Sequence, residues 1–585
     1  ITICAASGSG GMEVKMKNVE LYEVRPIRDL KDMLESSVKL YGEKAAFLSK
    51  PKGQADYIPI TYRQYKSDVD AFGTALMSLG LKGEKIALIG ENRYEWSISY
   101  LAVVNGTGVI VPLDKELPPN EIELLLDRSK ADAIIYSGNV REKVETLINK
   151  DTSLRYFISM DAEEDNGNIL SFGLLLQKGR DLLKDGDRTF LDAEIDAEAM
   201  NMLLFTSGTT DTAKAVMLSH KNICENLKGM CSMVYIDEKD TFLSVLPIHH
   251  TYECTCGFLC QLYRGSTIAY CEGLRHIVKN LKESKATVML GVPLLFESMY
   301  RQIMNQAIKA KGEKKIKFAI GLSNALRKIN IDIRRKLFKQ IHEALGGNIR
   351  LFISGAAAID PQTAKGFREL GISLIQGYGL TECAPILAVN RDIDYKDEAA
   401  GLPLPCVQVE IDNPDEDGIG EIKCKGPCVM LGYYNDPEAT AAAIRDGWFY
   451  TGDSGFIDKD GFVHITGRKK NVIITGNGKN VFPEEIETLL NRSLYIKESL
   501  VYGKGQSDGD TVICARIVPD REKIEEDIRK NSAPGSTVEE IIEKEVKRVN
   551  QSLVIYKHIK EFTLQDEEFI KTTTKKIKRY EELIK

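Results

Sequence analysis

The chain has 585 residues, of which 43% are hydrophobic and 28% charged, and this composition excludes a chain that is disordered throughout, because it supplies ample apolar surface for a packed core. With 78 Lys and Arg against 85 Asp and Glu, the formal net charge is −7, which argues against a general nucleic-acid-binding protein, since such proteins carry a strong basic excess. The length is several times the roughly 150 residues of an average domain and favours an enzyme with more than one domain.

The start of the chain and its cysteines bear on where the protein works. Residues 1–11 end in a linker-like Ser-Gly run directly before Met12, so we expect a fused tag or linker and a native start at Met12. The longest apolar run, 100–113, is shorter than the roughly 18 residues of a membrane span, so membrane contact is expected to be peripheral at most. The 12 Cys lack disulfide spacing, which favours the cytoplasm, and the three within 254–260 are expected on a buried helix rather than at a metal.

Short β-branched runs alternate with helical patterns through much of the chain. Residues 85–90, 133–136, 287–290 and 351–353 are predicted strands, and 92–102 is a predicted helix. Strands separated by helices predict an α/β fold with a mostly parallel sheet and helices on both of its faces.

The pattern changes twice toward the C-terminus. Residues 407–460 are rich in Gly and Asp turns, which predicts a β-rich, antiparallel subdomain. After residue 468 a short α+β pattern follows, ending in a Lys- and Glu-rich stretch. We therefore expect a large N-terminal domain over 12–468 and a small C-terminal domain over 469–585.

The most informative stretch is 202–220. An apolar strand at 203–205 leads into Thr206-Ser207-Gly208-Thr209-Thr210, and Lys214 follows. Small hydroxyl residues and glycine let backbone N–H and side-chain O–H groups surround phosphate oxygens, while the lysine supplies positive charge. Since the Walker A spacing is absent, the stretch predicts a phosphate loop of another kind.

Further motifs follow this loop in order along the chain. They are LPIHHTYE at 246–253, SGAA at 354–357, QGYGLTE at 376–382, YTGD at 450–453, GRKK at 467–470 and FIKTTTKKIKR at 569–579. Together with the phosphate loop they resemble the adenylate-forming (AMP-binding) enzymes, which include acyl-CoA synthetases, luciferases and the adenylation domains of peptide synthetases. Within that superfamily, 471–487 looks most like bacterial long-chain fatty acid–CoA ligases.

The resemblance implies a two-step reaction. A carboxylate attacks the α-phosphate of ATP to give acyl-AMP and pyrophosphate, and the thiol of coenzyme A then displaces AMP. The implied phosphate-binding residues are Thr206, Ser207, Gly208, Thr209, Thr210 and Lys214. The implied nucleotide-binding residues are Gly355, Ala356, Gln376, Gly377, Tyr378, Gly379, Thr381, Asp453 and Arg468. Tyr378 would stack on adenine, and Asp453 would accept hydrogen bonds from both ribose hydroxyls.

Four residues are implied to be catalytic: Thr206, His250, Glu382 and Lys576. Glu382 would bind Mg²⁺, a hard cation that favours carboxylate oxygen. Lys576 would bridge the carboxylate and the α-phosphate with a compact charge on a flexible stem. His250 would lie beside the acyl tunnel or the attacking carboxylate as a gating or positioning residue, since an ionised carboxylate needs no general base.

The resemblance also implies a moving C-terminal domain. Residues 469–585 would act as a lid that rotates about Lys470 between the two half-reactions. The rotation would withdraw Lys576 and bring Gly476, Gly478 and Lys479 toward the thiol of coenzyme A.

The phosphate loop departs from the family pattern T-S-G-T-T-G-x-x-K-G at two glycines, which are replaced by Asp211 and Ala215. Glycine permits close backbone approach to phosphate, whereas Asp211 would place a carboxylate near the triphosphate. We therefore predict weakened ATP binding or slow adenylation. The leading hypothesis is a ligase for a medium- or long-chain fatty acid. An acyl-AMP or acyl-carrier-protein ligase and a non-catalytic acyl- or nucleotide-binding homologue stay open as alternatives.

Overall fold

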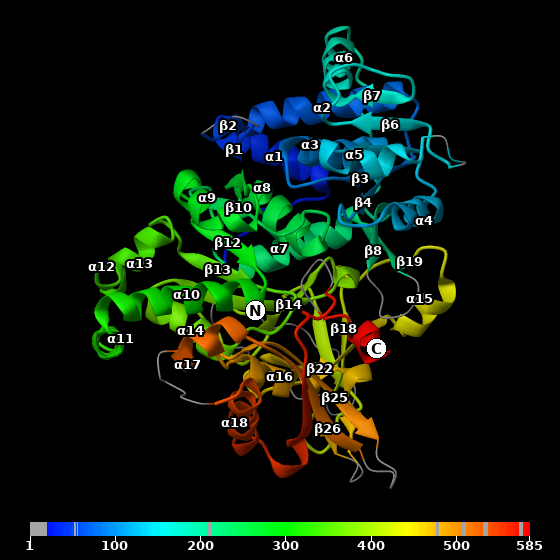
Figure 1. The fold of residues 1–585 in the computed structure, drawn as a ribbon. Helices are drawn as coiled ribbons and strands as arrows, with labels where there is room; N and C mark the ends of the chain where they lie inside the picture. Colours follow the sequence, from blue (N-terminus) through cyan, green and yellow to red (C-terminus); the bar gives the residue numbers. More distant parts are fainter. Residues whose placement is uncertain are drawn as a thin grey trace. The chain divides into compact units, whose positions relative to one another are not determined.

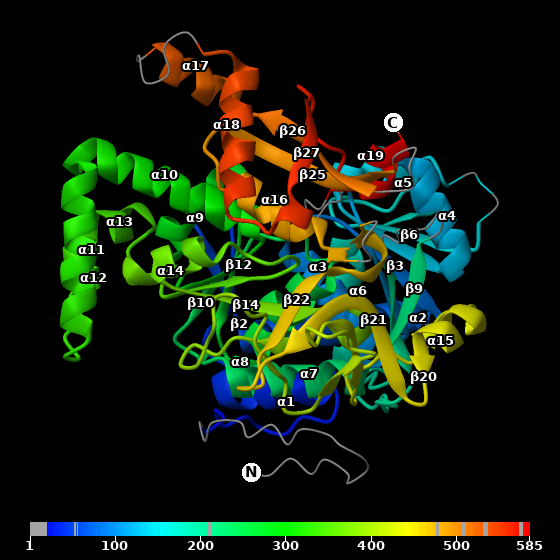
Figure 2. The same ribbon diagram turned by 90° about the horizontal axis from the view of Figure 1, so that it is seen from below.

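The computed structural model describes residues 20–51, 54, 56–148, 150, 152–206, 213–475, 479–505, 511–529, 536–571 and 577–584. They form two compact units, drawn in two views in Figures 1 and 2. The first unit contains the chain up to Val409 with Cys424–Phe449 and Lys459–Phe462, and the second contains Glu410–Lys423, Tyr450–Asp458 and the chain from Val463 onward. The expected domain boundary between residues 468 and 469 stays a prediction.

An eight-stranded sheet lies in the first unit. Its strands, in spatial order, are β19 (Gly432–Tyr433), β9 (Lys214–Ser219), β8 (Met200–Thr206), β4 (Val109–Leu113), β3 (Lys85–Ile89), β5 (Ala133–Tyr136), β6 (Tyr156–Ser159) and β7 (Ile169–Ser171). The strands from β8 to β7 pair in parallel, while β9 pairs antiparallel with β8 and with β19. Buried aliphatic runs form β3, β4 and β5, as expected for parallel strands covered on both faces.

A nine-stranded sheet forms the rest of the framework of the first unit. Its strands are, in spatial order, β16 (Leu402–Pro403), β15 (Ile386–Val389), β14 (Ser373–Gly379), β13 (Leu351–Ser354), β12 (Val288–Gly291), β10 (Thr241–Ser244), β11 (Thr267–Tyr270), β1 (Ala45–Ser49) and β2 (Ile58–Thr61). The strands from β14 to β1 are parallel, and β2, β15 and β16 pair antiparallel. The rings of Phe296, Phe352 and Phe367 pack together in its core.

Helices of the first unit connect these strands. They are α1 (Leu30–Tyr41), α2 (Tyr62–Ser78), α3 (Tyr94–Ala102), α4 (Pro119–Ser129), α5 (Arg141–Glu145), α6 (Phe172–Lys184), α7 (His220–Met233), α8 (Cys260–Arg264), α9 (Ile277–Ser284), α10 (Pro293–Lys311), α11 (Glu313–Arg327), α12 (Arg334–Leu337), α13 (Lys339–Ala344), α14 (Pro361–Glu369) and α15 (Pro437–Ala443). The expected α/β class is thus confirmed. The three cysteines at 254–260 are buried on a π-helical turn (Tyr252–Leu259) and the start of α8, as expected.

The region of Gly and Asp turns forms a five-stranded sheet, which confirms the expected β-rich character of 407–460. Its strands are β17 (Gln408–Asp412), β18 (Gly420–Lys425), β21 (Trp448–Ile457), β20 (Ile444–Arg445) and β22 (Val463–Arg468). Strand β21 pairs antiparallel with both β20 and β22.

The C-terminal part of the second unit has the expected α+β character. Its elements are β23 (Ile473–Ile474), β24 (Asn480–Val481), α16 (Pro483–Asn491), β25 (Ile496–Gly505), β26 (Thr511–Pro519), α17 (Arg521–Arg529), α18 (Val538–Gln551), β27 (Ile559–Leu564) and α19 (Arg579–Ile584). Ile486, Val501, Ile517 and Ile542 share one buried core between the helices and the three-stranded sheet β25-β26-β27. In the described parts of both units, none of the helices is long and apolar enough to cross a membrane.

Candidate functional site

The predicted phosphate loop connects the two strands of a hairpin. Strand β8 pairs antiparallel with β9, and Thr206 lies opposite Lys214, with the Thr206 Oγ1 donating to the Lys214 carbonyl over 3.4 Å. Ser207, Gly208, Thr209, Thr210 and Asp211 lie outside the described residues. The hairpin therefore fixes where the loop begins and ends, and it brings two of the predicted phosphate ligands together.

Ala215 occupies regular strand in this hairpin. It pairs with Phe205, and its side chain is buried in the core of the eight-stranded sheet. Extended backbone is open to any residue with a Cβ atom. The freedom of glycine is therefore not needed at position 215, and the prediction of weakened ATP binding rests on Asp211 alone, which lies outside the described residues.

Lys214 and Glu382 meet through a residue that the sequence reasoning did not single out, Tyr433. The Tyr433 hydroxyl donates to Glu382 Oε1 over 3.0 Å, and Lys214 Nζ lies 4.5 Å from the centroid of the Tyr433 ring. Burial, and then the nearby Glu382 carboxylate, raise the pKa of Tyr433 well above its usual range, so the hydroxyl keeps its proton and stays a donor. The only signal in the sequence was the Gly-Tyr pair at 432–433, which is too short to be informative.

The pairing of three strands explains this meeting. Strand β19 adds to β9, with Tyr433 opposite Val216, and the Met430 amide donates to the Glu382 carbonyl over 2.8 Å. Glu382 lies on a short 3₁₀ turn directly after β14, beside Thr381. The turn is tied to the segment after β10 by a hydrogen bond from Thr251 Oγ1 to Thr381 Oγ1 (3.3 Å). Lys214, a predicted phosphate ligand, and Glu382, the predicted Mg²⁺ ligand, thus both lie next to Tyr433 in the first unit.

The predicted adenine loop follows β13 and contains one close approach and one residue in a left-handed conformation. A Cβ atom on Gly355 would lie 2.6 Å from Cζ of Tyr252, so only glycine fits there. Ala356 has a φ of +72°, a left-handed conformation that is uncommon for alanine and that concentrates at functional sites. Tyr378 on β14 is mostly buried, between Gly377 and Gly379.

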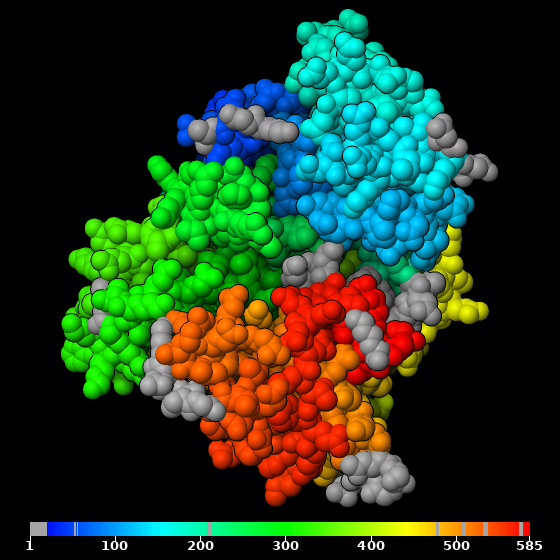
Figure 3. Space-filling model, viewed as in Figure 1, coloured from blue at the N-terminus to red at the C-terminus, as the bar shows by residue number. Residues whose placement is uncertain are grey.

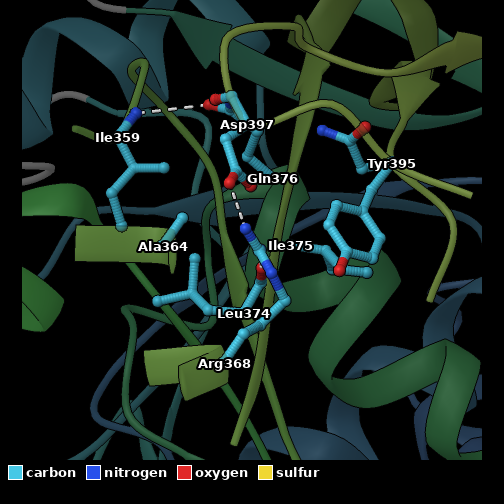
Figure 4. Close-up of a pocket in the computed structure, with 9 residues that line it drawn as sticks. Ile359, Ala364, Arg368, Leu374, Ile375, Gln376, Tyr395 and Asp397 are labelled. Carbon is cyan, nitrogen blue, oxygen red and sulfur yellow. Dashed lines mark hydrogen bonds and ion pairs between the residues drawn. The ribbon is translucent and has the colours of Figure 1, made fainter. Parts of the chain in front are cut away.

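The side chain of Gln376 makes hydrogen bonds to backbone groups of the protein. Its Oε1 accepts from the Ile359 amide (3.2 Å), and its Nε2 donates to the carbonyls of Asp397 and Ala399 (2.9 Å each). Figure 4 shows it beside a recess that is also lined by Arg368, which pairs with Asp397. The recess is too narrow to admit even a water-sized group, so it is not a ligand pocket. A contact from Gln376 to a nucleotide would therefore come from its backbone.

The predicted ribose ligands lie in the second unit and are paired with each other. Asp453 on β21 faces Arg468 on β22, and Arg468 Nε lies 2.8 Å from Asp453 Oδ1. Asp453 is buried, and its amide donates to Thr451 Oγ1 over 3.1 Å. Lys469 pairs with Glu421 (2.7 Å) at the start of the 3₁₀ turn that contains Lys470, the predicted hinge residue.

The remaining predictions in the second unit fall largely outside the described residues. Gly476, Gly478 and Lys576 are not among them, whereas Lys479 is, and its amide donates to Thr475 Oγ1 over 3.1 Å. Lys571 and Ile577, which flank the segment of Lys576, form an antiparallel bridge. The roles of these residues stay predictions.

His250 lies beside a second histidine and an aspartate. The rings of His249 and His250 are 4.1 Å apart between centroids, and His249 Nε2 lies 3.6 Å from Oδ2 of Asp114, which follows β4. Burial, and then the neighbouring His250 and Lys115, hold the pKa of His249 well below its usual value, so this imidazole is neutral at pH 7. Asp114 was not predicted, because 135 positions separate it from His249.

A partly buried hydrogen-bond network fixes the segment that leads to these histidines. Asn92 Nδ2 donates to Ser244 Oγ (2.9 Å) and to the Leu246 carbonyl (2.7 Å), and Asn92 Oδ1 accepts from the Ile248 amide (3.1 Å). Ser244 Oγ in turn donates to Glu253 Oε1 over 2.6 Å. This network joins the end of β3 to the end of β10 and positions the intervening backbone.

Glu253 gives a testable pH dependence of stability. The side chain is fully buried, and burial raises its pKa to about 8 from the ordinary 4.5. Because the folded value lies above the unfolded one, the contribution of this group to stability is complete below about pH 4.5 and is lost as the pH rises toward about 8. In Glu253→Gln we expect the free energy of unfolding to fall less steeply over this range than in the wild type, by up to about 1.4 kcal/mol per pH unit.

The measurement is urea unfolding at several pH values between these limits. Glu163→Gln, at an exposed position in the same unit, is the control and should follow the wild-type profile. Parallel profiles for the wild type and Glu253→Gln would contradict the assigned role of this carboxyl group.

Comparison with known proteins adds an independent line of observation. Residues 34–434 match the family described as AMP-binding enzyme. A long-chain-fatty-acid–CoA ligase of Salmonella typhimurium is 28% identical over 525 residues, which cover 84% of this chain and 86% of the relative.

Solved structures resemble nearly the whole chain. The anthranilate CoA ligase AuaEII in complex with anthranoyl-AMP has a TM-score of 0.76 at 20% identity, covering 97% of this chain and 98% of its own, a likeness of fold alone. ATP-bound MatB from Rhodopseudomonas palustris has a TM-score of 0.73 at 25% identity, covering 94% and 97%. The family match and the likeness of fold thus agree with the family resemblance that the ordered motifs indicated.

Proposed function

This chain belongs to the AMP-binding enzyme family, and from that membership we propose that it joins a medium- or long-chain fatty acid to coenzyme A in an ATP-dependent reaction. In the first step the carboxylate attacks the α-phosphate of ATP, and acyl-AMP and pyrophosphate form. In the second step the thiol of coenzyme A attacks the acyl carbon, and AMP leaves. The name of the Salmonella relative supports a long-chain acid as substrate.

The observation that carries this proposal is the meeting of Lys214, Tyr433 and Glu382. The first step brings two anions together, so it requires positive charge at the phosphates and a fixed alignment. Lys214 supplies charge at the end of the phosphate-loop hairpin, over the ring of Tyr433. Tyr433 holds one carboxylate oxygen of Glu382, and an oriented carboxylate fits Mg²⁺, a hard cation that takes oxygen ligands. When bound there, Mg²⁺ would supply charge that offsets the negative phosphate oxygens.

The other groups complete the proposed site. Asp453 and Arg468 would hold the ribose, and Tyr378 with Gly355 and Ala356 would hold adenine. Lys576 would serve the first step, and rotation about Lys470 would bring Lys479 toward the thiol for the second. His250 would orient the acid, since its backbone is fixed through the network of Asn92.

The decisive experiment is a pyrophosphate-release assay with a series of carboxylic acids of increasing chain length. We expect the highest kcat/KM with a medium- or long-chain fatty acid and AMP release that depends on free coenzyme A. AMP release that requires an acyl carrier protein instead would favour the carrier-protein ligase. Ligand binding without pyrophosphate release for every acid would favour a non-catalytic homologue.

Asp211 gives a prediction about the rate of the first step. Like unit charges within several ångströms of each other, at an effective dielectric near 20, repel each other by a few kcal/mol. In Asp211→Gly we therefore expect pyrophosphate release to be faster by about tenfold or more. Ala215→Gly is the matched control and should give no increase, because Ala215 occupies regular strand. Equal rates in the wild type and Asp211→Gly would contradict the repulsion.

A further inference from the structure

One helical segment of the first unit has a charge opposite to that of the whole chain. Residues 309–339, which cover the end of α10, all of α11 and α12, and the first residue of α13, contain eleven Lys or Arg and two Asp or Glu. The segment therefore carries a formal charge of +9 within a chain of −7. Helix α11 packs beside α10 and α14, and in Figure 3 green atoms of this part of the chain form part of the surface.

The outward side of α11 is apolar. Phe318 and Leu322 are 72% and 43% exposed, and they lie one turn apart on the same face, with exposed Ala325 continuing the row. Ile316 and Ser323 are buried on the inward side of the helix. Beyond the helix end, Ile329 is 65% exposed. An ordinary surface helix turns its apolar stripe toward the core, so this outward stripe is an exception.

Exposed lysines border the apolar row. Lys314, Lys315 and Lys317 lie at its start and Lys328 at its end. Lys317 pairs with Glu313 over 2.6 Å, and both of these side chains are largely exposed. An apolar row flanked by long basic side chains is the signature of a helix that lies in a membrane interface, where the chains of lysine extend to the headgroups.

We propose that the basic helical segment, residues 309–339, docks this protein on an anionic lipid bilayer. Phe318 and Leu322 would enter the boundary between headgroups and acyl chains, and the lysines would contact anionic headgroups. A helix of 15 residues is too short to span a bilayer, so it would lie in the plane of the surface. A bilayer fits better than an acidic protein, because side chains projecting from a convex helix insert between lipids without a matching pocket.

This inference stands apart from the proposed activity, and its test uses the full-length protein with vesicles. Co-sedimentation with vesicles of phosphatidylglycerol and phosphatidylcholine should show saturable binding that weakens with added salt. Phosphatidylcholine vesicles should bind far less. The double variant Phe318→Ser with Leu322→Ser should bind at least about tenfold more weakly. The triple variant Lys314→Gln, Lys315→Gln and Lys328→Gln should lose about a hundredfold, since each lysine contributes a factor of about five.

Matched controls come from the same unit. Leu274→Ser with Val278→Ser removes an exposed apolar pair of the same spacing, and Lys39→Gln, Lys178→Gln and Lys184→Gln removes three exposed charges elsewhere. Both controls should bind anionic vesicles like the wild type. Pyrophosphate release with a water-soluble acid and no vesicles should be unchanged in every variant, which separates this inference from the proposed function. Equal vesicle binding by the wild type and the double variant Phe318→Ser with Leu322→Ser would overturn the proposal. Binding of an acidic protein at this surface, without binding of vesicles, would also overturn it.

Discussion

Glu382→Gln is expected to lower kcat/KM for pyrophosphate release by about a thousandfold, the upper end of the effect of removing one preorganised electrostatic group. Glutamine keeps the size of the side chain and can still accept the hydrogen bond from Tyr433. It loses the negative charge that would hold Mg²⁺ against the phosphates, so the effect belongs to charge rather than packing. The loss should persist at saturating ATP, because the charge is needed where the phosphate bond is broken.

Two further variants help to interpret this result: one is a control, and the other removes the hydrogen bond to Glu382. Glu438→Gln changes an exposed glutamate of α15 in the same unit and should leave the rate unchanged. Tyr433→Phe keeps the ring beneath Lys214 but removes the donor to Glu382, and a lost hydrogen bond to a charged group should lower kcat/KM by about tenfold. An unaltered rate in Glu382→Gln, with an unaltered Tm, would mean that the metal lies elsewhere.

Asp453→Asn is expected to raise the KM for ATP by about a hundredfold with a smaller effect on kcat. The carboxylate would accept from two ribose hydroxyls, and the asparagine amide offers one acceptor oxygen and turns an N–H toward ligand or Arg468. Losing the charge-assisted character of two hydrogen bonds, at about tenfold each, accounts for the size of the effect.

A substrate lacking one hydroxyl tests the same contact from the other side. With 2′-deoxy-ATP the wild type should lose about tenfold in kcat/KM, whereas Asp453→Asn should lose much less. Asp446→Asn is the control, because Asp446 is exposed and has a φ of +51°, which asparagine also tolerates. Equal discrimination by the wild type and Asp453→Asn would show that Asp453 does not contact the ribose.

Local features of the fold were predictable. The strand expected at 133–136 is β5, and those at 85–90 and 351–353 match β3 and β13 to within one residue, because short runs of buried aliphatic residues between turns have few alternatives. The hairpin at the phosphate loop was also signalled locally, by an apolar strand on each side of the Ser-Thr-Gly run. The roles of Lys470 and Lys576 are predictions that depend on the resemblance and on movement.

Contacts between distant residues were not predictable in the same way. Tyr433 meets Glu382 because β19 pairs with β9, and Asn92 reaches Ile248 because the ends of β3 and β10 lie close together. Neither contact leaves a pattern in the sequence, since a hydrogen bond between residues 51 or 156 positions apart imposes no periodicity on either segment. Gln376 shows the opposite case: the sequence motif did single it out, but its side chain makes hydrogen bonds to backbone groups of the protein rather than facing a nucleotide site.

The sequence by itself determined the family, because the motifs of that family are short segments whose residue types, spacing and order suffice to define them. Only the tertiary structure decided which side chains complete these motifs, and which side of α11 faces outward. A row of apolar residues at helical spacing gives the same sequence pattern whether the row is buried or exposed. Its direction is set by what the helix packs against, and in this chain Ile316 and Ser323 take the inward side and leave Phe318 and Leu322 at the surface.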